Sequence, residues 1–326
     1  MRAVTFALAL LLALGACAPK LQPIDLIKIE PQLTPYHLIA DDGAVLPIRT
    51  WLPDGPPQAV ILALHGFNDY SKAFEKPAEA WQKAGIATYA YDQRGFGEAP
   101  YHGRWAGADR MERDAGIAIR LLRERYPMTP LFLLGESMGG ALALDLAVRK
   151  QPAALTGLIL VAPAVRGRES LGSIASASLW LAGHTVPWFE LTGEGLNIRP
   201  SDNIQVLREL FKDPLVIKGT RVDAIYGLVD LMDAAVASAP HLTMPTLVLY
   251  GAHEEVVSMH AARSFLDSLP KAPNIKIAIY PYGYHMLLRD READPVIGDV
   301  AAWTKAPDQP LPSGADRRSV TAFLPR

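Results

Sequence analysis

One serine of this chain stands in a context that makes a nucleophile. Ser137 lies in the run Gly135-Glu136-Ser137-Met138-Gly139, which follows the apolar residues 131–134 and precedes a helical pattern of apolar residues. A buried strand, a tight turn and a helix form a nucleophile elbow, where glycines on both sides of the serine let the turn close. The alternative is a purely structural glycine turn. We predict that Ser137 is the nucleophile.

A serine hydroxyl needs a neighbouring base, and the base needs an acid to orient it. Of the eight histidines, His285 is the best candidate for the base because it follows the last expected strand. A loop histidine bonded to backbone is the alternative interpretation. The loop after residue 250 offers Glu254 as the acid, with Glu255 as its rival. His65 directly follows another strand, where we expect it to support the loop rather than transfer a proton.

Hydrolysis through such a serine also needs two backbone N–H groups aimed at the developing negative charge. Removing one donor of this kind raises the barrier by about 2.7–4 kcal/mol. We expect one N–H from Met138, the residue after the nucleophile, and the other from Phe67, in the loop that follows His65.

Other classes of site receive little support. His253, Glu254, Glu255 and His260 do not match the helical two-histidine spacing of a metal site, so no metal is expected. Gly95-Phe96-Gly97 follows a strand, but Pro100 stands where a third glycine would complete a dinucleotide fingerprint, so we expect no cofactor. The chain has a formal net charge of −2 and no long basic run, which gives no support for nucleic acid as a partner.

The only cysteine, Cys17, ends a segment that resembles a bacterial lipoprotein signal. Met1-Arg2 precedes an apolar run over residues 3–14, and the polar Ala18-Pro19-Lys20 follows the cysteine. The run is shorter than the roughly 20 residues that span a bilayer. We therefore predict a signal peptide over 1–17, lipidation of Cys17, a tether over 18–31 and a location on the membrane of the bacterial envelope. An ordinary cleaved signal is the alternative.

Apolar runs separated by helical patterns predict a mainly parallel, eight-stranded sheet with helices on both faces. The expected strands are residues 36–39, 45–51, 59–64, 86–91, 131–134, 155–161, 245–251 and 275–280. Between about 164 and 240 the strands give way to a mostly helical insertion that includes Trp180, Trp188 and Phe189. We assign residues 32–304 to one domain. The segment 305–326, rich in proline and charge, is predicted to be a flexible tail.

These motifs together resemble the monoacylglycerol lipase and lysophospholipase branch of the α/β-hydrolases, also described as the serine aminopeptidase S33 group. The resemblance rests on His65-Gly66-Phe67, on residues 91–97, on the elbow at 132–140 and on Tyr284-His285, and it covers about residues 36–303. The chain order of Ser137, Glu254 and His285 matches the order in that fold. The family usually carries aspartate where Glu254 stands.

The resemblance implies a serine hydrolase that cleaves carboxylic esters of monoacylglycerols or lysophospholipids, with the insertion as a lid over the acyl chain. The tryptophans of the insertion would serve equally well to pack the lid onto the core. Two alternatives stay open at this point: an aminopeptidase or other small-ester hydrolase of the same fold, and an inactive lipid-binding envelope lipoprotein. The oligomeric state does not follow from the sequence.

Overall fold

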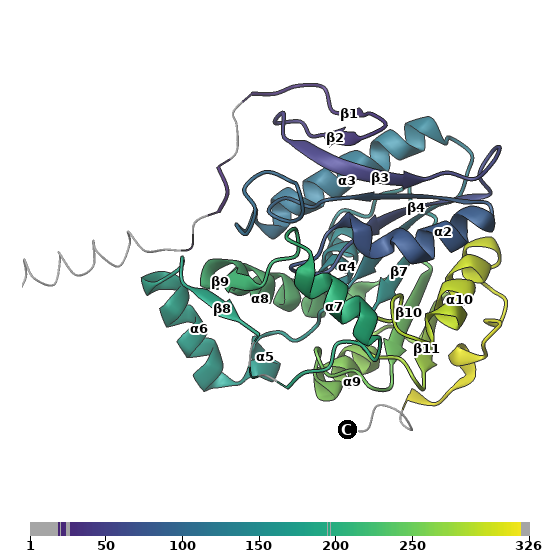
Figure 1. The fold of residues 1–326 in the computed structure, drawn as a ribbon. Coiled ribbons are helices and arrows are strands. Elements are labelled where there is room, and N and C mark those ends of the chain that lie inside the picture. Colours follow the sequence, from purple (N-terminus) through teal and green to yellow (C-terminus); the bar gives the residue numbers. More distant parts are fainter. Residues whose placement is uncertain (1–18, 20, 24–26, 194, 196, 321–326) are drawn as a thin grey trace, which may run out of the picture.

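The computed structural model describes residues 19, 21–23, 27–193, 195 and 197–320 (Figure 1). The whole of the predicted signal peptide, residues 1–17 with Cys17, lies outside this part of the chain. Within the described residues, no helix is both long enough and apolar enough to cross a bilayer.

A nine-stranded sheet runs through the molecule in the order β1-β2-β3-β5-β4-β6-β7-β10-β11. All pairings from β5 to β11 are parallel, and β1, β2 and β3 add an antiparallel edge. The strands are β1 (Gln32–Leu33), β2 (His37–Ile39), β3 (Val45–Trp51), β4 (Ala59–Leu64), β5 (Ile86–Tyr91), β6 (Leu131–Glu136), β7 (Gly157–Val161), β10 (Thr246–Gly251) and β11 (Ile275–Tyr280). The prediction of eight strands missed β1, because two residues are too few to show an alternating pattern.

The central strands are buried along their whole length because helices cover both faces of the sheet (Figure 1). This burial explains why they are continuous apolar runs rather than alternating ones. The core on one face includes α3 (Ala108–Arg125), α4 (Met138–Arg149) and α9 (Met259–Ser268). On the other face the core includes α2 (Glu75–Lys83), preceded by the short turn η1 (Ser71–Phe74), and α10 (Ala293–Lys305).

The insertion contains α5 (Arg168–Leu171), α6 (Ser173–Thr185), α7 (Ile204–Lys212) and α8 (Val222–Ser238), and η2 (Ala239–His241) leads back to the sheet. It is mostly helical, as predicted. It also holds a small antiparallel pair, β8 (Glu190–Thr192) with β9 (Gly219–Arg221), which we did not expect. Such short strands, paired across a long stretch of chain, give no readable pattern in the sequence.

The predicted flexible tail is partly wrong, since residues 305–320 pack against the sheet. Leu311 and Ala315, the latter in η3 (Ala315–Arg317), are buried in the same cluster as α10. The carboxylate of Asp299 on α10 accepts a hydrogen bond from the Ser313 N–H at 3.0 Å. Two well-placed apolar residues thus hold a segment whose overall composition indicates disorder. Residues 321–326 lie outside the described part.

Candidate active site

Ser137 sits at the sharp turn between β6 and α4. Its φ of 52° and ψ of −115° are strained for a residue with a side chain. A side chain at Gly139 would place its Cβ 2.1 Å from the Leu64 carbonyl oxygen, and one at Gly135 would come equally close to Gly139. Only glycine permits this approach, which raises the Ser137 hydroxyl above the carboxyl end of the sheet.

The structure brings Ser137, His285 and Glu254 together in one hydrogen-bonded chain. Nδ1 of His285 lies 2.8 Å from Oε2 of Glu254, and Nε2 of His285 lies 2.9 Å from Oγ of Ser137. A carboxylate only accepts hydrogen bonds, so Nδ1 carries the proton and Nε2 is free to accept the hydroxyl proton. Glu254 and His285 are both buried, at 2% and 7% exposure. The geometry is that of a nucleophile, base and acid.

The neighbouring glutamates point to different partners. The second oxygen of Glu254 accepts hydrogen bonds from the N–H groups of Val256 and Val257, at 2.8 and 2.9 Å, which fixes the carboxylate toward His285. Glu255 instead accepts a hydrogen bond from the Arg199 N–H at 2.7 Å. The structure therefore places Glu254, and not Glu255, at the histidine.

His285 is a stronger base here than an ordinary imidazole. Burial alone lowers the pKa of His285, but the adjacent Glu254 carboxylate raises it by charge and by hydrogen bonding, and the net pKa is raised. His65 behaves in the opposite way, because complete burial lowers its pKa. Its Nδ1 donates to the Gly66 carbonyl at 2.8 Å and its Nε2 accepts from the Gln93 N–H at 2.9 Å. Because both ring nitrogens of His65 are hydrogen-bonded to the backbone, His65 stabilises the loop that carries Gly66.

That loop and the elbow are close neighbours. A Cβ placed on Gly66 would lie 3.4 Å from the Cβ of Ser137, so the following residue, Phe67, is next to the nucleophile. Met138 begins α4, and the first N–H groups of a helix have no partner within it. Both expected oxyanion donors, Phe67 and Met138, thus belong to segments that meet at Ser137.

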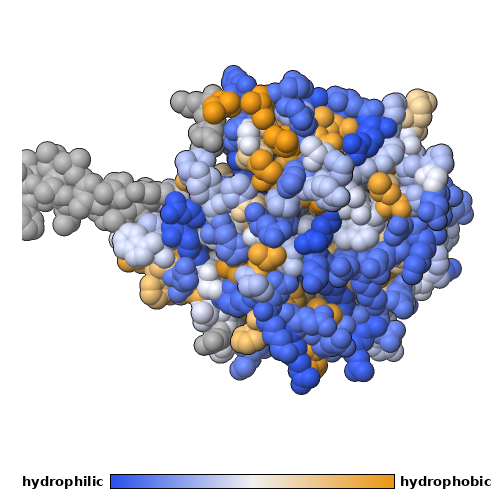
Figure 2. Space-filling model, turned by 45° about the horizontal axis from the view of Figure 1, so that its top comes forward, coloured by the Kyte–Doolittle hydropathy of each residue, from blue (hydrophilic) through white to orange (hydrophobic). Residues whose placement is uncertain are grey.

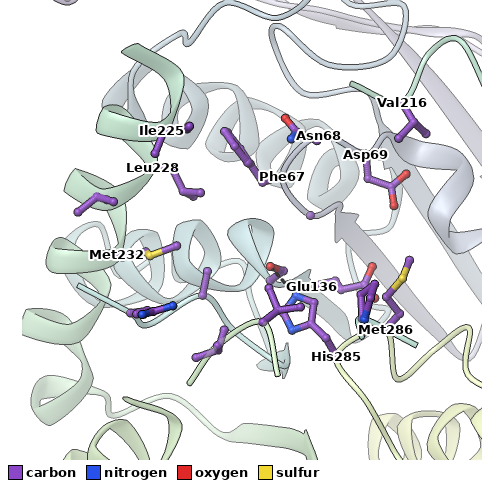
Figure 3. A pocket seen from close by; sticks show the side chains of 18 of the residues that line it. Phe67, Asn68, Asp69, Glu136, Val216, Ile225, Leu228, Met232, His285 and Met286 are labelled. Atoms are coloured by element: carbon purple, nitrogen blue, oxygen red, sulfur yellow. Dashed lines mark hydrogen bonds between the residues drawn. The ribbon is translucent and has the colours of Figure 1, made fainter. Parts of the chain in front are cut away.

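A cavity of about 560 Å³ opens over Ser137 and His285. Apolar side chains of the insertion form one wall, and in Figure 3 Ile225, Leu228 and Met232 project into it from α8. The volume falls within the range of about 300–1,000 Å³ usual for small-molecule sites. An apolar chain on the insertion side can thus lie with its polar end at the serine.

The sequence analysis missed three charged residues on the opposite wall. Asp69, Glu136 and Arg289 line the same cavity, and Figure 3 shows Asp69 and Glu136 across from Ile225, Leu228 and Met232. Arg289 forms ion pairs with both acids, at 2.7 Å to Asp69 and 3.3 Å to Glu136. One signal was available: Glu136 ends a buried strand, and a buried carboxylate requires a cationic partner.

Chemically, the arrangement can form and break an acyl bond at Ser137. The hydroxyl can lose its proton to His285, the charge that forms on His285 faces Glu254, and the N–H groups of Phe67 and Met138 can face an oxyanion. The cavity supplies a largely apolar space beside these groups.

Comparison with known proteins gives a consistent result. The family described as "Serine aminopeptidase, S33" matches residues 55–292. A human monoglyceride lipase is 28% identical over 279 residues, which cover 80% of this chain and 87% of the lipase. A monoacylglycerol lipase of Mycolicibacterium smegmatis is 25% identical over 276 residues, which cover 82% of this chain and 95% of that protein.

Solved structures show the same architecture. A Paleococcus ferrophilus monoacylglycerol lipase superposes with a TM-score of 0.66 at 22% identity, covering 80% of this chain and 98% of that one. A soluble variant of Saccharomyces cerevisiae monoglyceride lipase, in complex with a substrate analog, superposes with a TM-score of 0.69 at 17% identity. The superposition covers 87% of this chain and 96% of that one. These likenesses confirm the predicted α/β-hydrolase fold.

Proposed function

Because the chain belongs to the serine aminopeptidase S33 family of α/β-hydrolases, we propose that it is a serine hydrolase that cleaves carboxylic esters of monoacylglycerols. The observation that carries the proposal is the continuous hydrogen-bonded chain from Ser137 through His285 to Glu254 at the floor of an apolar cavity. The human and mycobacterial relatives, both named as lipases of monoacylglycerols, support the choice of substrate.

The reaction follows from the roles that the geometry gives each group. His285 Nε2 takes the Ser137 proton as Oγ attacks the ester carbonyl, and the N–H groups of Phe67 and Met138 stabilise the oxyanion. The imidazolium then protonates the departing alcohol, which leaves an acyl group on Ser137. Water, deprotonated by His285, releases the fatty acid and restores the hydroxyl. Glu254 stabilises the imidazolium in both steps.

The cavity favours an ester over a peptide with a free amino terminus. An aminopeptidase needs an available carboxylate to bind the amine of its substrate. The carboxylates among the described residues that line this cavity, Asp69 and Glu136, are both paired with Arg289. The rest of the lining is mostly apolar, which suits an acyl chain.

A panel of substrates tests this function. We expect turnover of monoacylglycerols and short p-nitrophenyl esters, and none of aminoacyl anilides; lysophospholipids test the choice of head group. Hydrolysis of the anilides alone would contradict the proposal and favour a peptidase. Failure both to hydrolyse any substrate and to react with a fluorophosphonate would favour the inactive lipid-binding lipoprotein.

The enzyme is further proposed to work at a membrane, attached through lipid on Cys17. Supporting this, α6 and the segment after it expose large apolar side chains, and apolar groups are visible at the left edge of Figure 2, where α6 lies in Figure 1. The exposed residues of this surface, which we call the lid face, are Ile174, Trp180, Leu181, Trp188 and Phe189. Exposed apolar patches of this kind mark protein or membrane contacts.

The start of the described chain lies beside the lid face. Pro19 lines a cavity together with Tyr226 of α8. The Tyr226 ring contacts His184 edge-on at 5.5 Å, and His184 stacks on Trp180 at 4.5 Å. Cys17 precedes Pro19 by two residues, a reach of at most about 7 Å. Lipid on Cys17 would therefore bring the lid face toward the bilayer.

The described part of the segment predicted as a tether is attached to the domain at several residues. The Ile29 N–H donates to the Asp41 carbonyl at 2.9 Å, and Glu30 pairs with Arg120 at 3.5 Å. The Gln22 N–H donates to the Trp105 carbonyl at 3.0 Å, and the Gln22 side chain donates to the Arg104 carbonyl at 2.6 Å. These contacts support an anchor that holds the domain close to the membrane rather than at the end of a long flexible linker.

Expression in a bacterial host tests the anchor. We expect a mature chain that begins at a diacylated Cys17, and we expect Cys17→Ser to move the protein from the membrane fraction to the soluble fraction. An unmodified chain beginning at another residue, found by mass spectrometry, would refute the lipoprotein proposal.

A further inference from the structure

One guanidinium group connects the three loops that carry the active-site groups. Arg289 lies four residues after His285, and its Nη1 pairs with Oδ2 of Asp69 at 2.7 Å. Its Nη2 pairs with Oε2 of Glu136 at 3.3 Å. Asp69 lies two residues after Phe67 in the oxyanion loop, and Glu136 directly precedes Ser137 in the elbow.

These ion pairs are shielded from solvent. The side chain of Glu136 is 3% exposed, and those of Asp69 and Arg289 are each 11% exposed. Burial raises the pKa of Glu136, and Arg289 opposes that rise. Burial also disfavours the charged form of Arg289 and so lowers its pKa, but the carboxylates of Asp69 and Glu136 raise this pKa more. The net pKa of Arg289 is raised, and the guanidinium stays charged. Water and salt therefore weaken this cluster much less than an exposed ion pair.

The backbone beside Arg289 is fixed from a second direction. Asp290 accepts hydrogen bonds from the Ser201 hydroxyl at 2.5 Å and from the Tyr284 N–H at 2.7 Å. The Met286 N–H donates to the Pro200 carbonyl at 2.9 Å. The histidine loop is thus held on both sides, and Arg289 projects from a firmly held segment toward the other two loops.

We propose that Arg289 is a positioning residue that sets the relative placement of the Ser137 elbow, the Phe67 loop and His285. The inference rests on the proposed function, since it concerns how the same site reaches its reactive geometry. A guanidinium presents donors in a fixed fork and can hold two carboxylates at once, whereas a lysine acts as a point charge. Misplacement of reacting groups by about 1 Å can cost about 10²-fold in rate.

The same three residues could instead bind the alcohol half of the substrate. They line the cavity, and within the described residues Oε1 of Glu136 and Nε of Arg289 have no hydrogen-bond partner. The two roles differ in a measurable way. A positioning residue affects every ester alike through kcat, whereas a binding residue affects KM and only for esters with a hydroxylated alcohol.

The experiment compares two butyrate esters, p-nitrophenyl butyrate and 1-butyrylglycerol, in the full-length protein. For Arg289→Met we expect kcat to fall about 10²-fold on both esters with KM within about 2-fold. The rate of fluorophosphonate labelling should fall by the same factor. In Arg289→Lys, which keeps the positive charge but loses the planar fork of donors, kcat should fall less than in Arg289→Met. Arg291→Met replaces an exposed arginine two residues away, and should match the wild type.

Three results would overturn the proposal. A rise in KM for 1-butyrylglycerol alone would make Arg289 a binding residue. An unchanged kcat in a folded Arg289→Met or Arg289→Lys protein would make its role purely structural. A wild type that hydrolyses neither ester would refute the proposed function and this inference together, whereas an active wild type with unaffected Arg289 variants refutes only the inference.

Glu136→Gln supplies a readout that a purely structural role would not move, and it remains informative should Arg289→Met fail to fold. Burial lowers the pKa of His285, the charges of Glu254 and Glu136 raise it, and the charge of Arg289 lowers it. Loss of the Glu136 charge should therefore shift the acidic limb of the kcat/KM profile to lower pH and also reduce kcat on both esters. If the Glu136→Gln protein has the wild-type kcat and the acidic limb of its kcat/KM profile does not shift, the proposal is contradicted.

Discussion

The sheet core and two helices of the insertion, α6 and α7, differ sharply in how many of their side chains are buried. In α4, which begins at the nucleophile turn, ten of twelve residues are buried, whereas in α6 of the insertion only Gly183 is buried and in α7 none is. A densely packed helix cannot shift without opening cavities, and this rigidity suits groups that must stay aligned. Within the insertion, α8 is also well packed, with nine of its 17 residues buried, and it supplies the cavity wall, whereas the exposed surface of α6 suits contact with a membrane. The core therefore fixes the chemistry, and the insertion selects what reaches it.

The largest effect should come from the nucleophile of the core. Ser137→Ala should lower kcat for p-nitrophenyl butyrate by about 10⁶-fold, the scale typical for loss of a catalytic serine. Ser178→Ala replaces an exposed serine of α6 and should leave kcat unchanged. Equal activities of the two variants would remove the basis for assigning the chemistry to the core.

The acid gives the next largest effect. Glu254→Gln should lower kcat about 10⁴-fold, as loss of the acid does in a serine protease. Glu255→Gln, whose parent side chain binds the Arg199 N–H instead, should change kcat little. The reverse ranking would mean that the loop after β10 is placed one residue out of register.

Comparison of the wild type with Glu254→Gln also tests the pKa of the base. Burial lowers the pKa of His285 and Glu254 raises it above the ordinary value, and His285 must be neutral to accept the serine proton. The wild-type kcat/KM should therefore fall as the pH drops through this raised pKa. In Glu254→Gln the acidic limb should move to lower pH, while an identical limb in both proteins would show that Glu254 does not act on His285.

The insertion wall of the cavity should control chain length rather than chemistry. Met232→Trp overfills the apolar wall on α8, and overfilling a packed apolar space costs about 1–3 kcal/mol. We expect kcat/KM for long-chain monoacylglycerols to fall about 10-fold or more and that for an acetate ester to stay within about 2-fold. Met128→Trp, at a site 93% exposed, is the matched control. An equal loss on both esters would mean that α8 also shapes the catalytic groups.

The smallest effect on turnover should come from the lid face. The double variant Trp180→Ser, Trp188→Ser should hydrolyse a soluble butyrate within about 2-fold of the wild type, since neither side chain lines the cavity. Its affinity for lipid vesicles should fall at least about 10-fold, because each large apolar side chain that enters lipid contributes about 1.5–3 kcal/mol. Met128→Ser serves as the control for loss of an exposed apolar group. Unchanged vesicle binding would show that the lid face does not meet the membrane.

The elements that could be predicted from the sequence are those whose signal lies in neighbouring residues of the chain. The elbow, the buried strands and the loop histidine all have signals in their immediate sequence neighbourhood, so Ser137 and His285 could be predicted from the sequence alone. Glu254 and Glu255 could only be ranked, since adjacent residues on one loop share every sequence signal. Which one turns inward depends on the Val256 and Val257 N–H groups that hold it.

What the sequence could not supply arises from contacts between distant segments. Asp69, Glu136 and Arg289 lie in three segments far apart along the chain, and no sequence pattern links them. The short strands β1, β8 and β9 exist because of their partners rather than their own composition. The packing of Leu311 likewise depends on a neighbouring helix and not on the composition around it.

The central claim is that Ser137 carries the acyl group, and mapping of the covalent adduct tests it most directly. The wild-type protein is treated with an alkyl fluorophosphonate, digested and sequenced by tandem mass spectrometry, beside a sample preincubated with a monoacylglycerol. We predict a single phosphonylated residue, Ser137, with labelling slowed by the monoacylglycerol. An adduct on another residue, or no adduct in a protein that still hydrolyses esters, would contradict the account.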